Sequence, residues 1–302
     1  MTSLLGVAYN VLGPIFLVIG LAVLIDRRFS PDPRAFSRAV VYLFSPCLAF
    51  SGIAHSDLTT DELGLIVAMA ALSTLVMAVV GWGLARLFRF DRKLESAFML
   101  SVVLINAGNY GLPLNEFAFG QAGLQRAIVF YVVTAVAANT LGIYFASRGT
   151  ASVRRSLLNV LTVPLPYATV LGFVVNVRDI ALPLPLDRAA TLVGQAAVPC
   201  MLLILGLQLS RTSVKGRIGP ILLAVTARLV IAPLVALPLA ALLGLSGLAR
   251  QVSIVEASMP TAVTGGVLAT EFGSDAEFTT AAILVSTLAS IITLSVLLSL
   301  IM

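Results

Sequence analysis

The sequence predicts an all-α membrane protein of ten transmembrane helices, arranged as two inverted five-helix repeats. Three observations predict this fold: the apolar composition, the sorting of cations between loops, and an internal similarity at one constant offset. Of the 302 residues, 59% are hydrophobic and only 11% are charged, whereas a soluble domain carries about 25% charged residues. Apolar runs of about 20 residues, enough to cross the hydrocarbon layer as a helix, recur along the chain.

The apolar runs define the expected helices, and the charged or turn-forming residues between them define the loops. The expected spans are residues 4–25, 36–55, 62–88, 94–118, 122–147, 157–177, 188–209, 216–243, 249–271 and 277–302. Segments of about ten residues with alternating hydrophobicity, which would predict a β-barrel, are not seen.

Lysine and arginine are concentrated in alternate loops. The loops after the first, third, fifth and seventh spans hold 14 of the 19 cations, and the other loops hold 4. The positive-inside rule places the first set in the cytoplasm, so both chain termini are expected on the extracytoplasmic side of the inner membrane. The cations of the first set are Arg27, Arg28, Arg34, Arg38, Arg86, Arg89, Arg92, Lys93, Arg148, Arg154, Arg155, Arg211, Lys215 and Arg217.

The two halves of the chain resemble each other at an offset of 153 residues. Pro46-Cys47 falls on Pro199-Cys200, and Phe119-Gly120 falls on Phe272-Gly273. These matches predict a first repeat over residues 1–150 and a second over 151–302. Because each repeat has an odd number of spans, the second enters the membrane from the opposite side, an arrangement that recurs in secondary transporters.

The fourth expected span contains residues that interrupt a helix. Asn106, Asn109, Tyr110 and Pro113 lie among glycines in the middle of this apolar segment. Proline removes a backbone donor, and asparagine amides must find partners in hydrocarbon. We therefore expect a broken helix that faces protein or a water-filled cavity.

The ninth expected span is interrupted at the corresponding place, because the offset maps 106–113 onto 259–266. Matched breaks are either packing kinks or, as we favour, the binding site of a transporter, since free half-helix ends can bind charged ligands. The predicted substrate-binding residues are Asn106, Asn109, Tyr110, Pro113, Pro260, Thr261, Thr264 and Arg228.

Two charged residues lie inside expected spans, Arg228 in the eighth and Glu256 in the ninth. Such residues are costly in a membrane unless paired, and they mark functional sites. Three roles stay open: a structural ion pair between them, Glu256 as the ligand of a coupling ion that Arg228 balances, or Arg228 as a ligand of a substrate carboxylate. The predicted ion-coupling residues are Glu256, Asn106, Thr134 and Gln208, for H⁺ or Na⁺, with no other metal or cofactor.

The stretch from Asn106 to Leu114, with Glu256 to Val263, resembles the auxin efflux carrier family, whose prokaryotic members are described as organic acid permeases. The resemblance implies a fold shared with bile acid symporters, in which the two broken helices cross. It further implies a scaffold of helices 1, 2, 6 and 7 and a mobile core transport domain of helices 3–5 and 8–10. The bile acid symporters also favour Glu256 as an ion ligand.

Together these features predict a secondary active transporter, a permease that moves a small organic anion by elevator-like alternating access. The expected partners are the lipid bilayer, the anion and a second copy of the chain bound through the scaffold helices. No nucleic acid partner is expected, because the net charge of +5 comes from the loops. A channel and, more remotely, an intramembrane enzyme are the alternatives, although no catalytic motif is found.

Two ion pairs are expected between neighbouring residues. Asp26 is expected to pair with Arg27, and Asp179 with Arg178.

Overall fold

The computed structural model describes residues 4–147, 162–213 and 217–302. Several features expected from the sequence lie outside these residues. They are the start of the helix expected at 157–177, the repeat boundary at 150–151, and the cations Arg148, Arg154, Arg155 and Lys215. The described part of the chain is helical and contains no strands. Seven of its helices are long and apolar enough to cross a membrane.

Helices occupy the ten predicted ranges as far as they are described, and several contain a π-helical turn (η). In the first half they are α1 (Leu4–Val7), η1 (Ala8–Leu12), α2 (Gly13–Phe29), α3 (Pro33–Ala39), η2 (Val40–Phe44), α4 (Ser45–Ala54), α5 (Thr60–Leu87), α6 (Arg92–Val103), η3 (Ala107–Gly111), α7 (Leu112–Ala137), η4 (Ala138–Gly142) and α8 (Ile143–Ala146). In the second half they are α10 (Leu165–Val177), α11 (Leu184–Gln195), α12 (Ala197–Ser210), α13 (Ile218–Thr226), η5 (Ala227–Ile231), α14 (Ala232–Leu242), α15 (Gly247–Ala257), α16 (Val263–Glu271) and α17 (Ala276–Ile301).

The loop expected between residues 118 and 122 is reduced to one glycine. Gly120 has φ 67° and ψ −160°, a conformation that only glycine adopts readily, inside what is otherwise one helical stretch over α7. The chain therefore bends within α7 at Gly120. The expected spans ended at residue 118 and began again at 122, whereas the helix resumes directly after Gly120.

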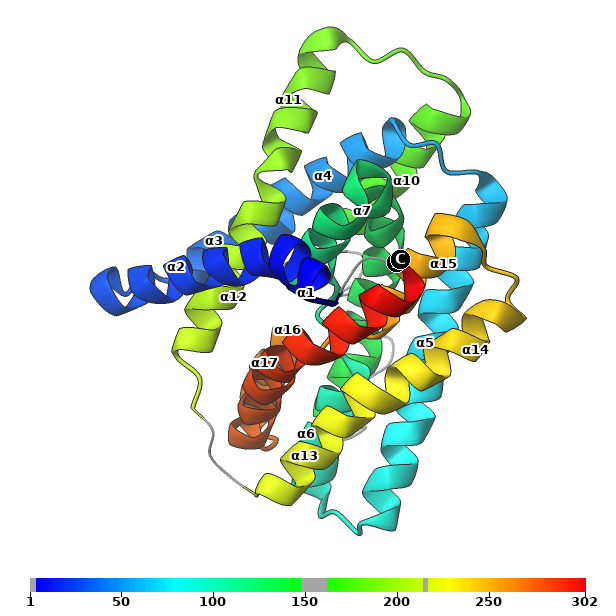
Figure 1. Ribbon diagram of the computed structural model, residues 1–302. Helices are drawn as coiled ribbons and strands as arrows, with labels where there is room; N and C mark the ends of the chain where they lie inside the picture. Colours follow the sequence, from blue (N-terminus) through cyan, green and yellow to red (C-terminus); the bar gives the residue numbers. More distant parts are fainter. Residues whose placement is uncertain (1–3, 148–161, 214–216) are drawn as a thin grey trace.

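One group of helices packs through glycines. Helix α12 packs against α2, and α4 contacts both α10 and α11 (Figure 1). A Cβ atom on Gly172 would lie 2.7 Å from the Phe50 carbonyl oxygen, and one on Gly194 would lie 2.8 Å from the Leu48 nitrogen. Gly206 is equally close to Ile19. Such small residues let membrane helices approach backbone to backbone, so these helices fit one another tightly.

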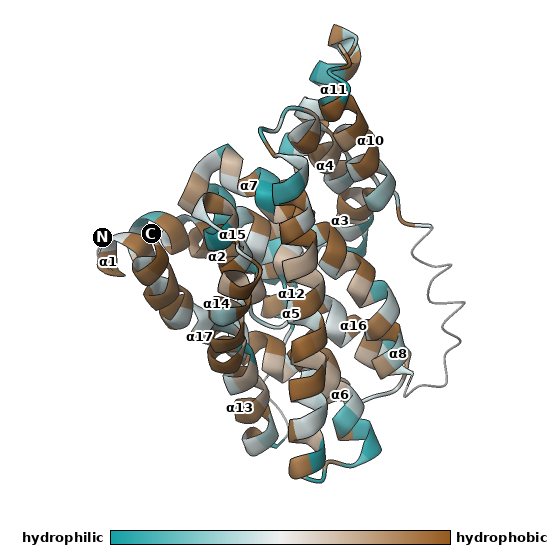
Figure 2. Cartoon of the chain, turned by 90° about the vertical axis from the view of Figure 1, so that its right-hand side faces the viewer, coloured by the Kyte–Doolittle hydropathy of each residue, from teal (hydrophilic) through white to brown (hydrophobic). Residues whose placement is uncertain are grey.

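The second group surrounds the broken helices. Helix α7 contacts α5 and α15, α17 contacts α6 and α16, and α14 contacts α15. Helix α1 also packs against α17, so the first and last helices of the described chain lie together (Figure 2). Hydrophilic residues gather at helix ends and in loops, whereas the flanks are apolar (Figure 2), as expected for helices surrounded by lipid.

An ion pair links the ends of α2 and α12. The Asp26 carboxylate accepts hydrogen bonds from Arg211 Nη2 at 2.6 Å and Nε at 3.0 Å. The expected pairing of Asp26 with Arg27 was wrong, because consecutive helical side chains point in different directions. The pair expected between Asp179 and Arg178 is also absent from the ion pairs of the described residues.

Candidate functional site

The two interrupted helices meet at their breaks. Helix α6 ends at Val103 and η3 begins at Ala107, whereas α15 ends at Ala257 and α16 begins at Val263. Between them, Ile105 and Thr261 form an antiparallel bridge. The Asn106 N–H donates to the Pro260 carbonyl at 2.9 Å, and the Ala262 N–H donates to the Leu104 carbonyl at 2.8 Å. Each break thus satisfies backbone groups that the other leaves free.

Side chains complete the contact between the two breaks. The Thr261 hydroxyl donates to the Ser101 carbonyl at 2.8 Å, near the end of α6. The Thr261 N–H donates to the hydroxyl of Ser286 on α17 at 3.2 Å. Because Thr261 is fully buried, these bonds are made where an unpaired polar group would be costly. They hold the α15–α16 break against α6 and α17.

Arg228 binds the carboxyl ends of both interrupted helices. Its guanidinium donates to the carbonyls of Ala257 at 2.7 Å, Met259 at 2.9 Å and Val102 at 3.2 Å. The last carbonyls of a helix lack intrahelical donors and carry the negative end of the helix dipole. One buried cation therefore neutralises two helix ends, and the side chain is 1% exposed.

An ion pair between Arg228 and Glu256, one of the three roles that the sequence left open, is not formed among the described residues. The ion pairs of the described residues include neither side chain. Arg228 directs its donors to backbone carbonyls instead, so its charge is balanced by helix dipoles rather than by a carboxylate. The hypothesis of a structural pair between these two residues was wrong.

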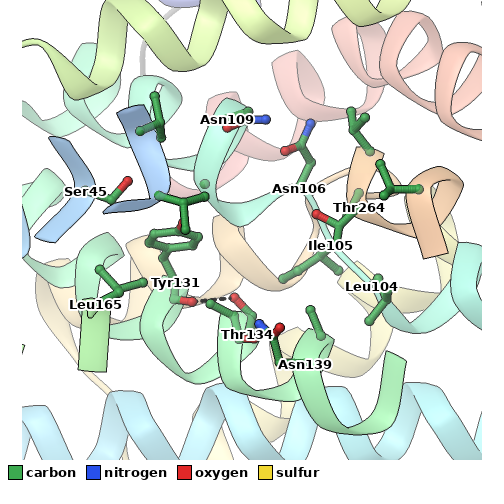
Figure 3. Close-up of a pocket in the computed structure, with 18 of the residues that line it drawn as sticks. Ser45, Leu104, Ile105, Asn106, Asn109, Tyr131, Thr134, Asn139, Leu165 and Thr264 are labelled. Atoms are coloured by element: carbon green, nitrogen blue, oxygen red, sulfur yellow. Dashed lines mark hydrogen bonds between the residues drawn. The ribbon is translucent and has the colours of Figure 1, made fainter. Parts of the chain in front are cut away.

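A cavity of about 400 Å³ lies beside the crossing. Figure 3 shows Asn106 and Asn109 on one side of it and Thr134 and Asn139 on the other. None of the described side chains that line it is charged. Its described polar lining residues are Ser37, Tyr42, Ser45, Thr74, Asn106, Asn109, Tyr131, Thr134, Asn139, Gln208 and Thr264.

The amino ends of two half-helices face this cavity. The residues before η3 and α16, Asn106 and Ala262, line it and provide no side-chain cap for the helix that follows. The amide nitrogen of Asn106 is buried and has no hydrogen-bond partner. Free N–H groups and positive dipole ends are the features that bind anions in proteins. The described lining of the cavity thus combines two uncapped helix amino ends with an unpaired amide donor.

Glu256 is fully buried on the other side of η3. Its Oε1 accepts from the amide of Asn115 at 2.8 Å, whereas its Oε2 has no partner. A Cβ atom on Gly111 would lie 2.6 Å from Oε1, so only glycine leaves room for this carboxyl group. A buried carboxyl with a free oxygen requires either a proton or a cation. The turn η3 therefore has the cavity on one face and Glu256 on the other.

Five of the predicted site residues line the cavity, and the others do not. The lining residues are Asn106, Asn109, Thr134, Gln208 and Thr264; the others are Tyr110, Pro113, Arg228, Glu256, Pro260 and Thr261. Thr134 and Gln208 thus line the cavity, whereas Glu256 does not, so the three residues do not form one ion-binding site. The Tyr110 hydroxyl instead accepts from Ser290 at 3.2 Å, in the packed interior.

The residues predicted from the sequence did not include Asn115 or six further polar residues of the cavity, which are Ser37, Tyr42, Ser45, Thr74, Tyr131 and Asn139. Asn115 could have been found as one more amide in an apolar span, nine residues after Asn106. Tyr131 gave no signal, because one tyrosine in an apolar run is usual.

A second cavity of about 780 Å³ lies at the other end of the same helices. The first cavity is lined by residues 40–45 and 131–139, whereas the second is lined by residues 48–55 of α4 and 116–128 of α7. Pro46 and Phe130, which lie between the two sets of lining residues, are buried. The two cavities thus lie toward opposite ends of the same helices, with buried residues between them.

A polytopic helical protein with two crossing broken helices and a cavity at the crossing has the architecture of a membrane carrier. The chain matches the family described as "Membrane transport protein" over residues 12–157 and 150–298. It therefore belongs to this family, that of the auxin efflux carriers, as the sequence resemblance predicted.

Three relatives carry names that agree with this membership. Proteins named "Uncharacterized transporter" are 28% identical over 267 residues in Methanothermobacter thermautotrophicus and 26% identical over 274 residues in Methanocaldococcus jannaschii, each match covering 87% of both chains. A Rhizobium meliloti protein named "Putative malonate transporter" is 26% identical, over 100% of this chain and 97% of its own length.

Replacement of Arg228 by methionine should destabilise the protein strongly. The carbonyls of Val102, Ala257 and Met259 would lose their donor, at about 1–3 kcal/mol for each buried group left unsatisfied. Thermal unfolding in detergent should show a large decrease for Arg228→Met, a smaller one for Arg228→Lys and almost none for the exposed Arg250→Met. An Arg228→Met protein as stable as the wild type would contradict the assigned role.

Proposed function

We propose that the protein is a secondary active transporter that moves a small organic anion across the inner membrane by alternating access. The observation that carries this proposal is the crossing itself: two interrupted helices meet by their backbones, and the amino ends of two half-helices face a cavity. In secondary transporters, substrates bind at such half-helix ends near the membrane midplane.

In the proposed architecture, ten transmembrane helices form two inverted repeats, with the termini on the extracytoplasmic side. The glycine-packed helices α2, α4, α10, α11 and α12 would be the scaffold, and the helices around the crossing would be the moving core. The contacts within each group support this division. The cavities at opposite ends of the interface between the groups support an elevator-like movement. A homodimer would form through the scaffold.

The substrate class follows from the lining of the cavity. Two amino ends, the Asn106 amide and the hydroxyl of Thr264 offer donors without a fixed positive charge. A carboxylate bound there would be held by hydrogen bonds and dipoles, which permits its release during transport. Two such ends favour a small dicarboxylate. The relative named for malonate supports this choice.

Glu256 is the proposed binding site of the coupling ion, H⁺ or Na⁺. Its carboxyl group contacts η3 at Gly111, and the same turn presents Asn109 to the cavity. A change in the charge of Glu256 would therefore act on the turn that binds the substrate. Arg228 is not proposed as a substrate ligand, because its donors are directed to helix carbonyls.

Uptake of labelled malonate into liposomes that contain the purified protein tests the proposed function. We expect uptake that saturates and that exchanges labelled for unlabelled substrate. Asn106→Leu should raise the KM about tenfold, since a hydrogen bond to a charged group contributes about 1.5–3 kcal/mol, whereas the exposed Asn10→Leu should leave it unchanged. Flux that neither saturates nor exchanges would indicate a channel, and no uptake of any organic acid would refute the proposal.

Replacement of Glu256 by glutamine separates coupling from binding. Glutamine keeps the size of the side chain and cannot change its charge. We expect Glu256→Gln to lose uptake driven by a pH or Na⁺ gradient and to keep exchange of malonate, whereas the exposed Glu277→Gln should behave as the wild type. Unchanged dependence of uptake on both gradients would remove Glu256 from the coupling mechanism.

A further inference from the structure

A third cavity, of about 380 Å³, lies between α5, α6 and α8, away from the crossing. Figure 2 shows α6 and α8 at its lower right. No residue of this cavity takes part in the proposed transport site. It is lined by Trp82, Arg86, Arg92, Glu95, Ser96, Met99, Tyr144 and Phe145.

The cavity has an excess of positive charge. Arg86 lies at the end of α5, and Arg92 is the first residue of α6. Glu95 is the one carboxylate among the described lining residues, and its Oε1 lies 3.7 Å from Arg86 Nε. Arg92 takes part in no ion pair of the described residues. A cation at a helix amino end is unfavourable for the helix itself, so Arg92 is not explained by the stability of α6.

Exposed aromatic rings flank these two cations. The side chains of Trp82 and Tyr144 are 54% and 46% exposed, and Arg86 Cζ lies 5.7 Å from the centroid of the Trp82 ring. Tryptophan and tyrosine are enriched where membrane helices reach the headgroup level. Val79 and Leu87 on α5 are also largely exposed. An apolar surface therefore adjoins the basic end of the cavity.

The inner wall of the cavity is a fixed structure. Ser96 and Met99 on α6 are buried, and the Ser96 hydroxyl donates to the Phe145 carbonyl on α8 at 2.7 Å. This bond joins the two helices that form the wall, so the cavity is a defined space rather than a gap between mobile side chains.

We propose that this cavity binds the phosphate of an anionic phospholipid. Arg86 and Arg92 would bind the phosphate oxygens, and Trp82 and Tyr144 would contact the glycerol and the upper acyl chains. Basic pockets between transmembrane helices on the cytoplasmic side bind anionic headgroups in this way. The aromatic and apolar surroundings favour a lipid over free phosphate, which needs no apolar contact. The site does not depend on the proposed transport activity.

Trp82 makes the site directly measurable, because it is the only tryptophan in the sequence. Its fluorescence would be measured in liposomes that contain phosphatidylglycerol or phosphatidylcholine with the same brominated acyl chains, which quench tryptophan on contact. We expect phosphatidylglycerol to quench at lower mole fractions than phosphatidylcholine. Arg92→Gln should reduce this preference about fivefold, since one such cation contributes about 1 kcal/mol. Arg86→Gln should also reduce it.

Arg89→Gln is the matched control, because Arg89 lies in the same loop but does not line the cavity. It should keep the wild-type preference. Equal quenching by the two lipids, or equal losses in Arg89→Gln and Arg92→Gln, would overturn the proposal. Inorganic phosphate is tested separately at constant ionic strength: a spectral shift with phosphate but no preference for phosphatidylglycerol would assign the site to a soluble anion and reject the lipid.

Discussion

The structure depends on one contact, the antiparallel pairing of two interrupted helices at Ile105 and Thr261. Inside a membrane, an interrupted helix leaves donors and acceptors that water cannot satisfy. Here backbone groups of each break form hydrogen bonds with backbone groups of the other break. Arg228 donates to further carbonyls at the carboxyl ends of both interrupted helices. The surrounding helices then enclose this crossing, so α17 and η5 contribute Ser286 and Arg228 to it.

At the crossing, the carboxyl ends and the amino ends of the interrupted helices are stabilised differently. The two carboxyl ends are neutralised by a buried arginine, whereas the two amino ends remain uncapped beside a cavity whose described side chains are uncharged. This difference makes the cavity suitable for an anion. Because η3 separates the cavity from Glu256, the proposed substrate and coupling ion would act on one turn of backbone without sharing a ligand.

The sequence predicted the helical ranges and the two breaks well, because composition and proline act locally. Pro260 cannot continue the hydrogen bonding of α15, and this is evident without a structure. Side-chain partners depend on how helices pack, and they were predicted poorly. An ion pair with Glu256 was one of three roles left open for Arg228, which binds carbonyls instead. Asn115 was missed because its partner is distant in sequence. The conformation of Gly120 was also invisible in the apolar pattern.

A cysteine cross-link tests the crossing most directly. Ile105 and Thr261 face each other in an antiparallel pair whose flanking residues form the hydrogen bonds, a geometry with closely spaced side chains. In a variant with Cys47 and Cys200 replaced by serine, cysteines at 105 and 261 should form an intramolecular disulfide on mild oxidation, detected by mass spectrometry. Cysteines at 105 and 250 should not, because residue 250 lies near the start of α15 and Thr261 lies beyond its end. A cross-link for the second pair and none for the first would contradict the crossing described here.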